Sequence, residues 1–502
     1  MSLSSWTKQD IRLYAVLISL LISCYTILFP DLLNDDAYVY RRTAEIFLEQ
    51  GLLAAFEHYT WAAYSIVIAL VSELFNCDLF TAAYLINGIF SAIIVFAFIS
   101  IVKEIDNDKT VLLLAAICVL VYPQLNEYRY EVIRDLGYWA FSLVALWQLI
   151  LFMKAPSLQH GLGFCVAIML ASVLRIEALL YLIISPLCVL LDGRHHFTQR
   201  LRHFLLLLRL VVGLSLTTSA LLFLLNINVI TASINFLSTY LPFVKDLFNP
   251  DSDDAFAQAQ ILFNEHAANY SQRYISLFIA SGLFAIVAAK LISGFGLAFL
   301  GLLVFGVRKV FAKVETHLLL PLVAFLLINM GILFSFIFIT RFLSTRYTML
   351  FCLILTLFIP IILHRILLMA KRHNRGILAA RAIAVFLLYC GIDAYISFGL
   401  KKTYIADSVD WIENNTPSSA MLLTNNNAVA FYSGKIQDYD KIGPSLSETQ
   451  ILGANAGTYL AIEMNDAMRQ ILNNERVAQS MVLRKAFPDE VKQRIMIFEI
   501  LN

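Results

Sequence analysis

The stretch RLYAVLISLLISCYTILFPDLLNDDAYVYRR, residues 12–42, contains the pattern that decides the fold. Its first part, Leu13 to Phe29, is an apolar run with no small-residue cleavage site before Pro30. We therefore interpret this run as a retained membrane helix and not as a cleaved signal peptide. Its second part places two carboxylates, Asp35 and Asp36, directly after the helix. The pattern predicts a membrane protein with charged groups at the lipid boundary.

Composition extends this interpretation to the whole chain. Of the 502 residues, 60% are hydrophobic and 15% are charged, against about 25% charged in a soluble globular protein. An ordinary soluble enzyme is therefore excluded. The net charge of +1 gives no global field for nucleic-acid binding. The seven cysteines form no CxxC pair, so the sequence predicts neither a zinc site nor a disulfide framework.

Apolar runs recur along the chain and predict an all-α polytopic bundle of about eleven membrane helices. We expect these helices at residues 13–29, 79–102, 110–122, 137–153, 161–174, 178–191, 204–225, 280–306, 317–339, 347–369 and 377–399. Several of the runs are shorter than the roughly 20 residues of a full span, so their ends must extend into flanking residues.

Lys and Arg in short loops mark the cytoplasmic side of a membrane protein. In this count the basic clusters all lie on the same side as the N-terminus, and they are Lys103/Lys109, Lys154, Arg194/Arg200/Arg202, Arg308/Lys309/Lys313 and Lys371/Arg372/Arg375. The N-terminus is therefore expected in the cytoplasm. Three polar segments would face outward: residues 31–60, residues 226–275 and everything after about 400.

The C-terminal segment changes composition abruptly. We expect a transmembrane domain over residues 1–400 and a small soluble α/β domain over residues 401–502. The pattern predicts a helix near 405–413 and strands near 420–424, 458–462 and 495–500. No phosphate-binding loop or H-E-x-x-H motif occurs in this segment, so packing or partner docking is its expected role.

The first outward segment combines acidic residues with a helical pattern. Apolar residues from Ala37 to Leu48 recur at helical spacing up to Gly51, which predicts an amphipathic helix on the membrane surface. Asp35 either caps this helix or acts as a general base whose pKa is raised by partial desolvation. Asp36 suits the positive helix end. His58, a lone histidine in the same loop, is expected to be structural.

Two further charged turns are expected on the outer side. Helical spacing would place Glu131 and Asp135 on one face and allow Glu131 to pair with Arg134, although a solvated ion-pair turn explains the same pattern. Arg175 and Glu177 interrupt the long apolar run of residues 161–191. Residues two apart do not face each other on a helix, so we expect this pair to contact other loops or a ligand.

The last outward cluster contains Arg341, Arg346 and Tyr347. Outward arginines depart from the positive-inside bias and require counter-ions. Lipid headgroups could supply them. A phosphate-bearing substrate is the alternative, because Arg can bind phosphate with two hydrogen bonds.

Taken in order, these clusters resemble the GT-C glycosyltransferases of the bacterial inner membrane, a group that includes aminoarabinose transferases and relatives of protein O-mannosyltransferases. The resemblance rests on the acidic pair Asp35-Asp36, Tyr38, Ala44 and Gly51, Arg134-Asp135, the Arg-Pro-Glu-like Arg175-Ile176-Glu177, and Arg346-Tyr347. Residues 59–64, YTWAAY, are similar to the family's Tyr-Pro-Pro-x-Tyr stretch without its prolines. The resemblance covers residues 10–190 well and residues 315–370 moderately.

This resemblance implies an inverting glycosyltransferase that takes a hexosyl or pentosyl unit from a polyprenyl-phosphate carrier. Asp35 would deprotonate the acceptor hydroxyl and Asp36 would orient the acceptor. The leaving phosphate would be bound by Arg346 and Arg341 first, then by Arg134 and Arg175. The supporting residues would be Tyr38, His58, Glu131, Asp135, Glu177 and Tyr347.

The implied partners are the lipid-linked donor, the bilayer and an acceptor that is a cell-envelope glycan, a lipid or a protein. No cofactor is required by the chemistry, although paired carboxylates could hold a divalent ion. The expected location is the bacterial inner membrane, with the C-terminal domain in the periplasm. Two alternatives stay open: a lipid flippase or transporter without catalysis, and an enzyme of the O-antigen ligase or polymerase type.

Overall fold

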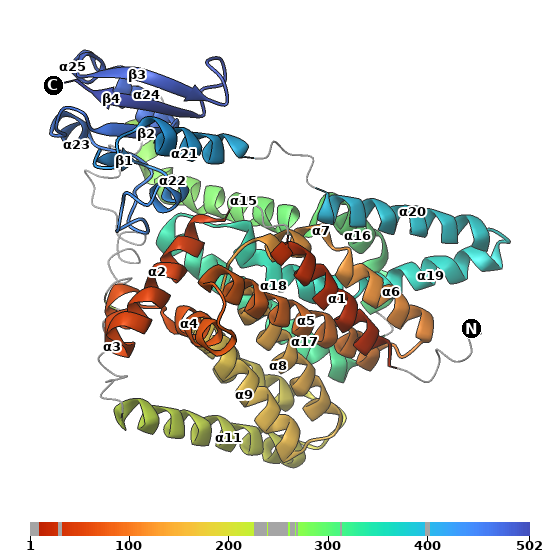
Figure 1. The fold of residues 1–502 in the computed structure, drawn as a ribbon. Helices are drawn as coiled ribbons and strands as arrows, with labels where there is room; N and C mark the ends of the chain where they lie inside the picture. The colour runs from red at the N-terminus through yellow and green to blue at the C-terminus, as the bar shows by residue number, and fades with distance from the viewer. Residues whose placement is uncertain are drawn as a thin grey trace. The chain divides into compact units, whose positions relative to one another are not determined.

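A computed structural model describes residues 10–28, 33–224, 238, 260–261, 267, 270–311, 314–396 and 402–501 of the chain. Most of these residues are helical, and one small sheet is formed near the C-terminus (Figure 1). The chain divides into two compact units. Unit 1 contains Met1–Ser23, Asn87–Tyr128 and Arg134–Tyr395, and unit 2 contains Cys24–Ile86, Arg129–Ile133 and Ile396–Asn502. The expected outer loop 226–275 lies almost entirely outside the described residues.

Unit 1 is a bundle of apolar helices. Helices α1 and α5 begin in one unit and end in the other. The elements are α1 (Ile11–Leu28), α5 (Leu79–Ile105), α6 (Lys109–Leu120), α7 (Pro123–Asn126), η2 (Glu127–Tyr130), α8 (Asp135–Lys154), α9 (Leu158–Leu174), η3 (Ile176–Ala178), α10 (Leu179–Ile184), η4 (Ser185–Leu191), α11 (Phe197–Leu224), η5 (Gln272–Tyr274), α15 (Ile275–Phe295), α16 (Leu297–Phe311), α17 (Thr316–Thr340), α18 (Thr345–Thr356), α19 (Ile359–Arg372) and α20 (Gly376–Tyr395).

Within the described residues, eight helices are long and apolar enough to cross a membrane, or nine if the bent pair Lys109–Leu120 and Pro123–Tyr130 forms one span. The chain is therefore a multi-pass membrane protein. Two of the eleven expected spans, 161–174 and 178–191, coincide with shorter apolar helices, Leu158–Leu174 and Ile176–Leu191. These two are shorter than the roughly 20 residues that a perpendicular span requires.

The expected span 280–306 is divided into α15 and α16 at Gly296. This glycine has φ +69°, in the left-handed region that residues with a Cβ rarely adopt. A Cβ there would also lie 2.5 Å from the side-chain amide nitrogen of Gln124. The left-handed backbone of Gly296 ends α15, and the close approach of Gln124 also favours a residue without a Cβ at this position.

Unit 2 joins the first loop after α1 to the C-terminal segment. Its loop helices are α2 (Asp35–Gln50), α3 (Leu52–His58) and α4 (Ala63–Phe75). The expected amphipathic helix up to Gly51 is confirmed as α2, whose buried residues include Ala37, Tyr40 and Ala44. Gly51 has φ +89°, which allows the chain to leave α2 and begin α3 without strain.

The C-terminal segment is the small α/β domain that the sequence predicts. Its elements are α21 (Thr403–Asn415), β1 (Leu422–Thr424), α22 (Asn427–Tyr432), α23 (Glu448–Leu452), β2 (Tyr459–Glu463), α24 (Asp466–Leu472), α25 (Glu475–Gln479), β3 (Met481–Phe487) and β4 (Ile495–Ile500). The expected helix 405–413 and the three expected strands are confirmed as α21, β1, β2 and β4. The strand order is β1-β2-β4-β3, with β1 parallel to β2 and the other pairs antiparallel.

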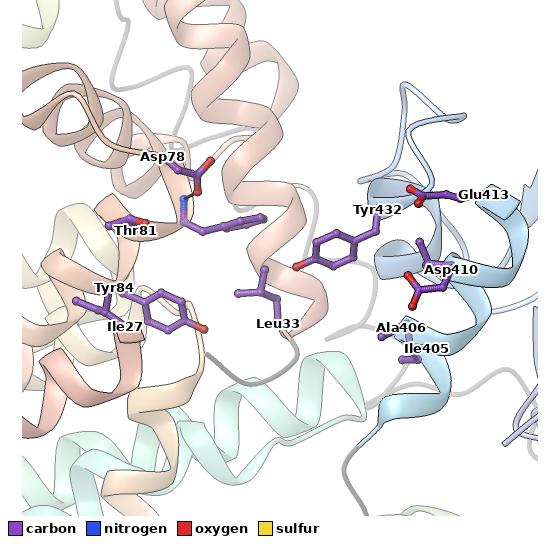
Figure 2. Close-up of a pocket in the computed structure, with 12 residues that line it drawn as sticks. Ile27, Leu33, Asp78, Thr81, Tyr84, Ile405, Ala406, Asp410, Glu413 and Tyr432 are labelled. Atoms are coloured by element: carbon purple, nitrogen blue, oxygen red, sulfur yellow. Dashed lines mark hydrogen bonds between the residues drawn. The ribbon is translucent and has the colours of Figure 1, made fainter. Parts of the chain in front are cut away.

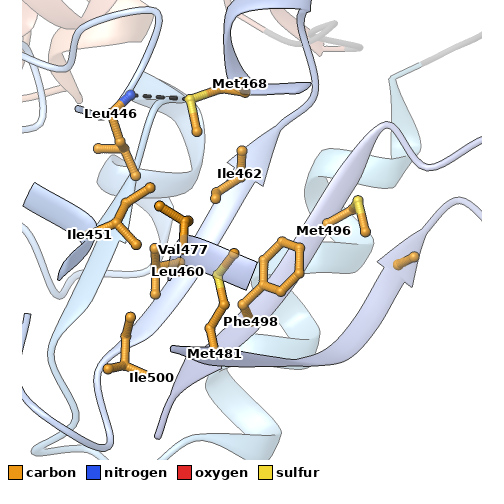
Figure 3. Close-up of a cluster of buried hydrophobic side chains, with 11 residues drawn as sticks. Leu446, Ile451, Leu460, Ile462, Met468, Val477, Met481, Met496, Phe498 and Ile500 are labelled. Atoms are coloured by element: carbon orange, nitrogen blue, oxygen red, sulfur yellow. Dashed lines mark hydrogen bonds between the residues drawn. The ribbon is translucent and has the colours of Figure 1, made fainter. Parts of the chain in front are cut away.

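One apolar cluster stabilises this sheet against the short helices α23 to α25 (Figure 3). It includes Leu460 and Ile462 of β2 together with Phe498 and Ile500 of β4, so alternate residues of the two strands face the same side. Burying such side chains contributes about 1.5–3 kcal/mol each. The domain therefore has a hydrophobic core of its own.

Candidate active site

The acidic pair lies in the first turn of α2. The helix begins at Asp35, and its N-cap is Asn34, which makes no side-chain capping hydrogen bond. Two carboxylates in this position interact favourably with the positive end of the helix dipole. The interpretation of Asp35 as the cap residue is therefore wrong, because the residue already belongs to the helix.

Asp35 is exposed to solvent, yet nearby protein removes part of its hydration. This desolvation raises the pKa of Asp35 above its ordinary value, and the charges of Glu463 and Asp36 raise it further. The positive charge of Lys402 acts in the opposite direction. A carboxylate with a raised pKa is a stronger proton acceptor once ionised, which is the property of a general base.

Asn34 uses its side chain to bind a segment that lies far from it in the sequence. Its side-chain amide donates to the carbonyl oxygen of Val132 at 3.2 Å, and its side-chain oxygen accepts from the Val132 amide at 2.8 Å. The segment before α8 is thereby fixed to the start of α2. Glu131 lies in this segment outside any helix, so the helical spacing that we expected for Glu131 and Asp135 is wrong.

Tyr38 belongs to an aromatic cluster that packs α2 on the C-terminal domain. Its ring is fully buried, and its centroid lies 6.1 Å from that of Phe80, 5.6 Å from Phe431 and 6.4 Å from Tyr439. Burial raises the pKa of Tyr38 well above its usual value, so the ring stays neutral. The structure places Tyr38 in a packing role beside the acidic pair.

Charged side chains of α2 and α3 also contact the C-terminal domain. Arg41 lies 3.0 Å from Glu45 and 2.6 Å from Asp78, and Glu45 also accepts a hydrogen bond of 2.8 Å from the hydroxyl of Tyr439. His58 lies 2.9 Å from the buried carboxylate of Asp440. Both contacts join the first loop to the 431–440 loop, which gives His58 the structural role expected from the sequence.

Unit 1 contains the second charged cluster, centred on Arg175. The guanidinium forms a short ion pair with Asp135 and lies 3.2 Å from Glu177. Its centre lies 4.3 Å from the ring of Tyr347 and 5.5 Å from that of Tyr138. Arg175 and Asp135 are 8% and 3% exposed, so this is a buried pair whose charge the protein itself compensates.

The expectation that Arg175 and Glu177 do not meet is wrong. Arg175 ends α9 in an extended conformation, with φ −145° and ψ 114°, and a short 3-10 helix starts immediately after it. The rule that residues two apart point in different directions holds on a continuous helix. Here the break between α9 and η3 brings both side chains to one point.

Arg134 and Arg346 surround the same carboxylate. Both act electrostatically on Asp135, and the guanidinium of Arg346 lies 5.4 Å from the ring of Tyr347. Arg175 is the third arginine near Asp135, and Glu177 is the second carboxylate of the cluster. Arginine side chains can bind an anion such as phosphate through charge-assisted hydrogen bonds.

Arg341 has a different setting from Arg346. It is exposed and ends α17 in the left-handed conformation, with φ +57°. A cation at this position interacts favourably with the negative end of the helix dipole. The position of Arg341 at the end of α17 therefore explains an arginine there without a ligand, whereas Arg346 does not end a helix.

Asn329, a polar side chain in the middle of the apolar helix α17, was not predicted as a site residue from the sequence. Asn329 is 1% exposed and donates a 2.9 Å hydrogen bond to the hydroxyl of Tyr181, while its side-chain oxygen has no partner among the described residues. It lines a cavity of about 10 Å³, together with Arg175 and Tyr347, which is room for about one water molecule. A lone amide within an apolar run was the available signal.

No group of three or more His, Cys, Asp or Glu side chains that could hold a metal ion occurs in the described part of the chain.

The fold of the chain is similar to that of several solved structures, although its sequence matches no known family. No family model and no curated protein sequence matches the chain. Solved structures do match, among them the archaeal oligosaccharyltransferase AglB from Archaeoglobus fulgidus, with an inhibitory peptide and a dolichol-phosphate. It has a TM-score of 0.53 and 12% identity over 91% of this chain and 70% of that chain.

ArnT from Cupriavidus metallidurans is similar over almost the full length of both chains. Its apo form has a TM-score of 0.50 at 11% identity, and its complex with undecaprenyl phosphate has 0.50 at 12%, each over 99% of this chain and 98% of that chain. The chain has the same fold as AglB and ArnT. The predicted architecture, a membrane helix bundle with a small C-terminal sheet domain, is thus confirmed.

Proposed function

We propose that this protein is an inverting glycosyltransferase that takes a sugar from a polyprenyl-phosphate carrier at the outer face of the membrane. Two features on a GT-C fold carry the proposal: an acidic pair that opens α2, and three arginines, Arg134, Arg175 and Arg346, that act on the buried carboxylate of Asp135. The dolichol-phosphate in the AglB complex and the undecaprenyl phosphate in the ArnT complex support a lipid-phosphate carrier.

Asp35 is the proposed general base. It would accept the proton of the acceptor hydroxyl as the acceptor oxygen attacks the anomeric carbon of the donor sugar. Its raised pKa suits this role, because an ordinary carboxylate accepts a proton from a hydroxyl only weakly. Asp36, in the same helical turn, would orient the acceptor.

Arg346 and Arg134 are the proposed ligands of the leaving phosphate. As the anomeric bond breaks, negative charge develops on the phosphate oxygens, and preorganised cations stabilise that charge. Arg175 is assigned a positioning role, because Asp135 and Glu177 already neutralise it. Arg341 takes a lower priority because it is exposed at a helix end. The arginines supply the positive charge in this scheme, so we propose no metal cofactor.

Asn34 immediately precedes Asp35 and binds both backbone groups of Val132. Val132 lies two residues before Arg134 in the chain. The double hydrogen bond therefore fixes the start of α2 to the segment 129–133 within unit 2.

Location and orientation form part of the proposal. The basic loops support a cytoplasmic N-terminus, and an odd number of crossings, such as the nine obtained when the bent pair forms one span, would place the C-terminal domain in the periplasm of a bacterial inner membrane. The acceptor would then be a cell-envelope glycan, a lipid or a protein that reaches this face.

Mass spectrometry of envelope glycans tests the proposal in cells that lack the protein and carry either the wild type or Asp35→Asn. We expect one glycan modification to depend on the wild type and to be absent with Asp35→Asn at equal protein abundance. In parallel, purified protein should bind undecaprenyl phosphate. Binding without any dependent glycan change would contradict the transferase and favour a lipid flippase.

A further inference from the structure

A cavity of about 580 Å³ lies in unit 2, within the range of about 300–1,000 Å³ that is typical of small-molecule sites. It is formed by the end of α1, Leu33 in the segment before α2, the start of α5, one face of α21 and the end of α22. The lining residues are Ile27, Leu33, Asp78, Phe80, Thr81, Tyr84, Ile405, Ala406, Val409, Asp410, Glu413 and Tyr432.

The two sides of the cavity differ in chemistry. Figure 2 shows Leu33, Thr81 and Tyr84 on one side and the α21 residues Asp410 and Glu413 on the other, with Tyr432 between them. The first side combines the apolar side chains of Ile27, Leu33 and Phe80 with the polar groups of Thr81, Tyr84 and Asp78. The α21 side presents carboxylates, which accept hydrogen bonds but do not donate them when ionised.

The charge of the cavity selects against anions. Three carboxylates line it, and none of its described lining residues is Lys, Arg or His. Asp78 is neutralised by Arg41, whereas Asp410 and Glu413 are exposed and lie one helical turn apart on α21. A phosphate or carboxylate in this cavity would therefore be repelled. The donor phosphate belongs with the arginines of unit 1 instead.

The same lining suits a sugar ring. Hydroxyl or ammonium groups of a sugar can donate to the carboxylates of Asp410 and Glu413. The ring of Tyr432 is 45% exposed and offers an apolar face with a polar tip, a combination that suits a ligand with one apolar and one polar side. The apolar side near Ile27 and Leu33 can take the aglycone that such a sugar carries.

The cavity also lies beside the candidate base. Leu33, which lines it, is two residues before Asp35 in the chain. Lys402, which acts electrostatically on Asp35, immediately precedes α21. Tyr38, one turn after Asp35, packs against Phe80 of the cavity wall. An acceptor bound in the cavity would therefore reach the start of α2.

We propose that this cavity binds the acceptor, and that the bound group is a non-anionic sugar ring whose hydroxyl or amino groups donate to Asp410 and Glu413. This inference rests on the proposed glycosyltransferase function. It assigns the two substrates to separate chemical environments: the phosphate-bearing donor to the arginine cluster and the sugar acceptor to the carboxylate-lined cavity.

Saturation-transfer NMR on the full chain in lipid nanodiscs tests the inference with three probes: methyl glucoside, methyl glucosaminide and methyl glucuronide. The wild type should bind the neutral and the amine-bearing glycoside and reject the glucuronide. The double variant Asp410→Asn/Glu413→Gln should bind the glucosaminide about tenfold more weakly, because it loses charge-assisted hydrogen bonds. Equal binding by the variant, or no glycoside binding by the wild type, would overturn the inference.

Two further variants distinguish the effect of the carboxylates from the effect of the cavity volume. Asp407→Asn removes an exposed carboxylate of α21 that does not line the cavity and should leave binding unchanged. Ala406→Trp fills the cavity from an exposed position without changing charge and should abolish binding of every glycoside. Unaltered binding in Ala406→Trp would overturn the location.

Undecaprenyl phosphate binding, measured on the same samples, separates this inference from the proposed function. If the wild type binds undecaprenyl phosphate but no glycoside, the acceptor cavity is wrong and the transferase stands. If it binds glycosides with the expected variant pattern but not undecaprenyl phosphate, the cavity stands and the donor assignment is wrong.

Discussion

The two charged clusters of this chain differ in how fully the protein compensates their charge. In unit 1, Arg175 is buried and surrounded by Asp135, Glu177 and two tyrosine rings. In unit 2, Asp35 stays exposed, with a raised pKa. A buried charge that is fully paired organises structure, because losing its partner is costly. A half-solvated carboxylate with a raised pKa is prepared for proton transfer.

The largest effect on stability should come from the centre of the unit 1 cluster. Arg175→Met leaves Asp135 buried without its main partner and should lower the free energy of unfolding by about 3–5 kcal/mol. The matched control Arg341→Met removes an exposed arginine at a helix end and should cost about 1 kcal/mol or less. Thermal unfolding of the purified variants measures both. A stable Arg175→Met protein with weakened donor binding would instead make Arg175 a phosphate ligand.

The next effect concerns donor affinity at Arg346. Removing a charge-assisted phosphate contact costs about 1.5–3 kcal/mol, so Arg346→Ala should weaken undecaprenyl phosphate binding roughly 10- to 150-fold. Arg346→Lys should rescue only part of this loss, because Lys keeps the charge but lacks the planar guanidinium. A titration with undecaprenyl phosphate measures the affinity of the wild type and of both variants. Unchanged affinity in Arg346→Ala would leave Arg134 or Arg341 as the phosphate ligand.

A smaller effect is expected from Asn329. Its side chain donates to Tyr181, which is hydrogen-bonded to Tyr138 beneath Arg175. Asn329→Leu removes this support and should weaken donor affinity about fivefold, which corresponds to about 1 kcal/mol. Stability should change little, because the substitution also removes a buried oxygen without a partner. A large stability loss with unchanged affinity would show a purely structural role.

The smallest effects should appear in the pH dependence of transfer. The base must be ionised, so the rate should rise with pH, and the raised pKa of Asp35 places the midpoint above the ordinary Asp value of about 3.9. Glu463→Gln removes a charge that raises this pKa and should move the midpoint down. Lys402→Gln should move it up. Each shift should be below about one pH unit, since such charges interact by less than about 1 kcal/mol. Shifts of the same sign in both variants would argue against Asp35 as the titrating group.

Local patterns in the sequence were sufficient for much of this architecture. The spacing from Ala37 to Gly51 predicted α2, and the change of composition near residue 400 predicted the sheet domain. Both signals are carried by neighbouring residues, because helices and strands have short periods. The arginine and carboxylate pairs were also visible, since charge is rare in an apolar chain.

Contacts between distant segments were not predictable in this way. The hydrogen bond from Tyr439 to Glu45 joins residues 394 positions apart, and no local period encodes it. The same applies to the cavity between α5 and α21, which forms only when both segments are in place. The prediction for Arg175 and Glu177 was wrong for another reason. It assumed helical spacing where the backbone of Arg175 is extended.

Proton acceptance by Asp35 is the central claim, and transfer by purified Asp35→Asn in proteoliposomes tests it most directly. The substrate is the undecaprenyl-phosphate sugar identified by the envelope comparison, and the readout is release of undecaprenyl phosphate with formation of the glycosylated product. We predict a loss of about 10²- to 10⁴-fold in turnover, with undecaprenyl phosphate affinity and thermal stability unchanged. Turnover close to that of the wild type would contradict the account.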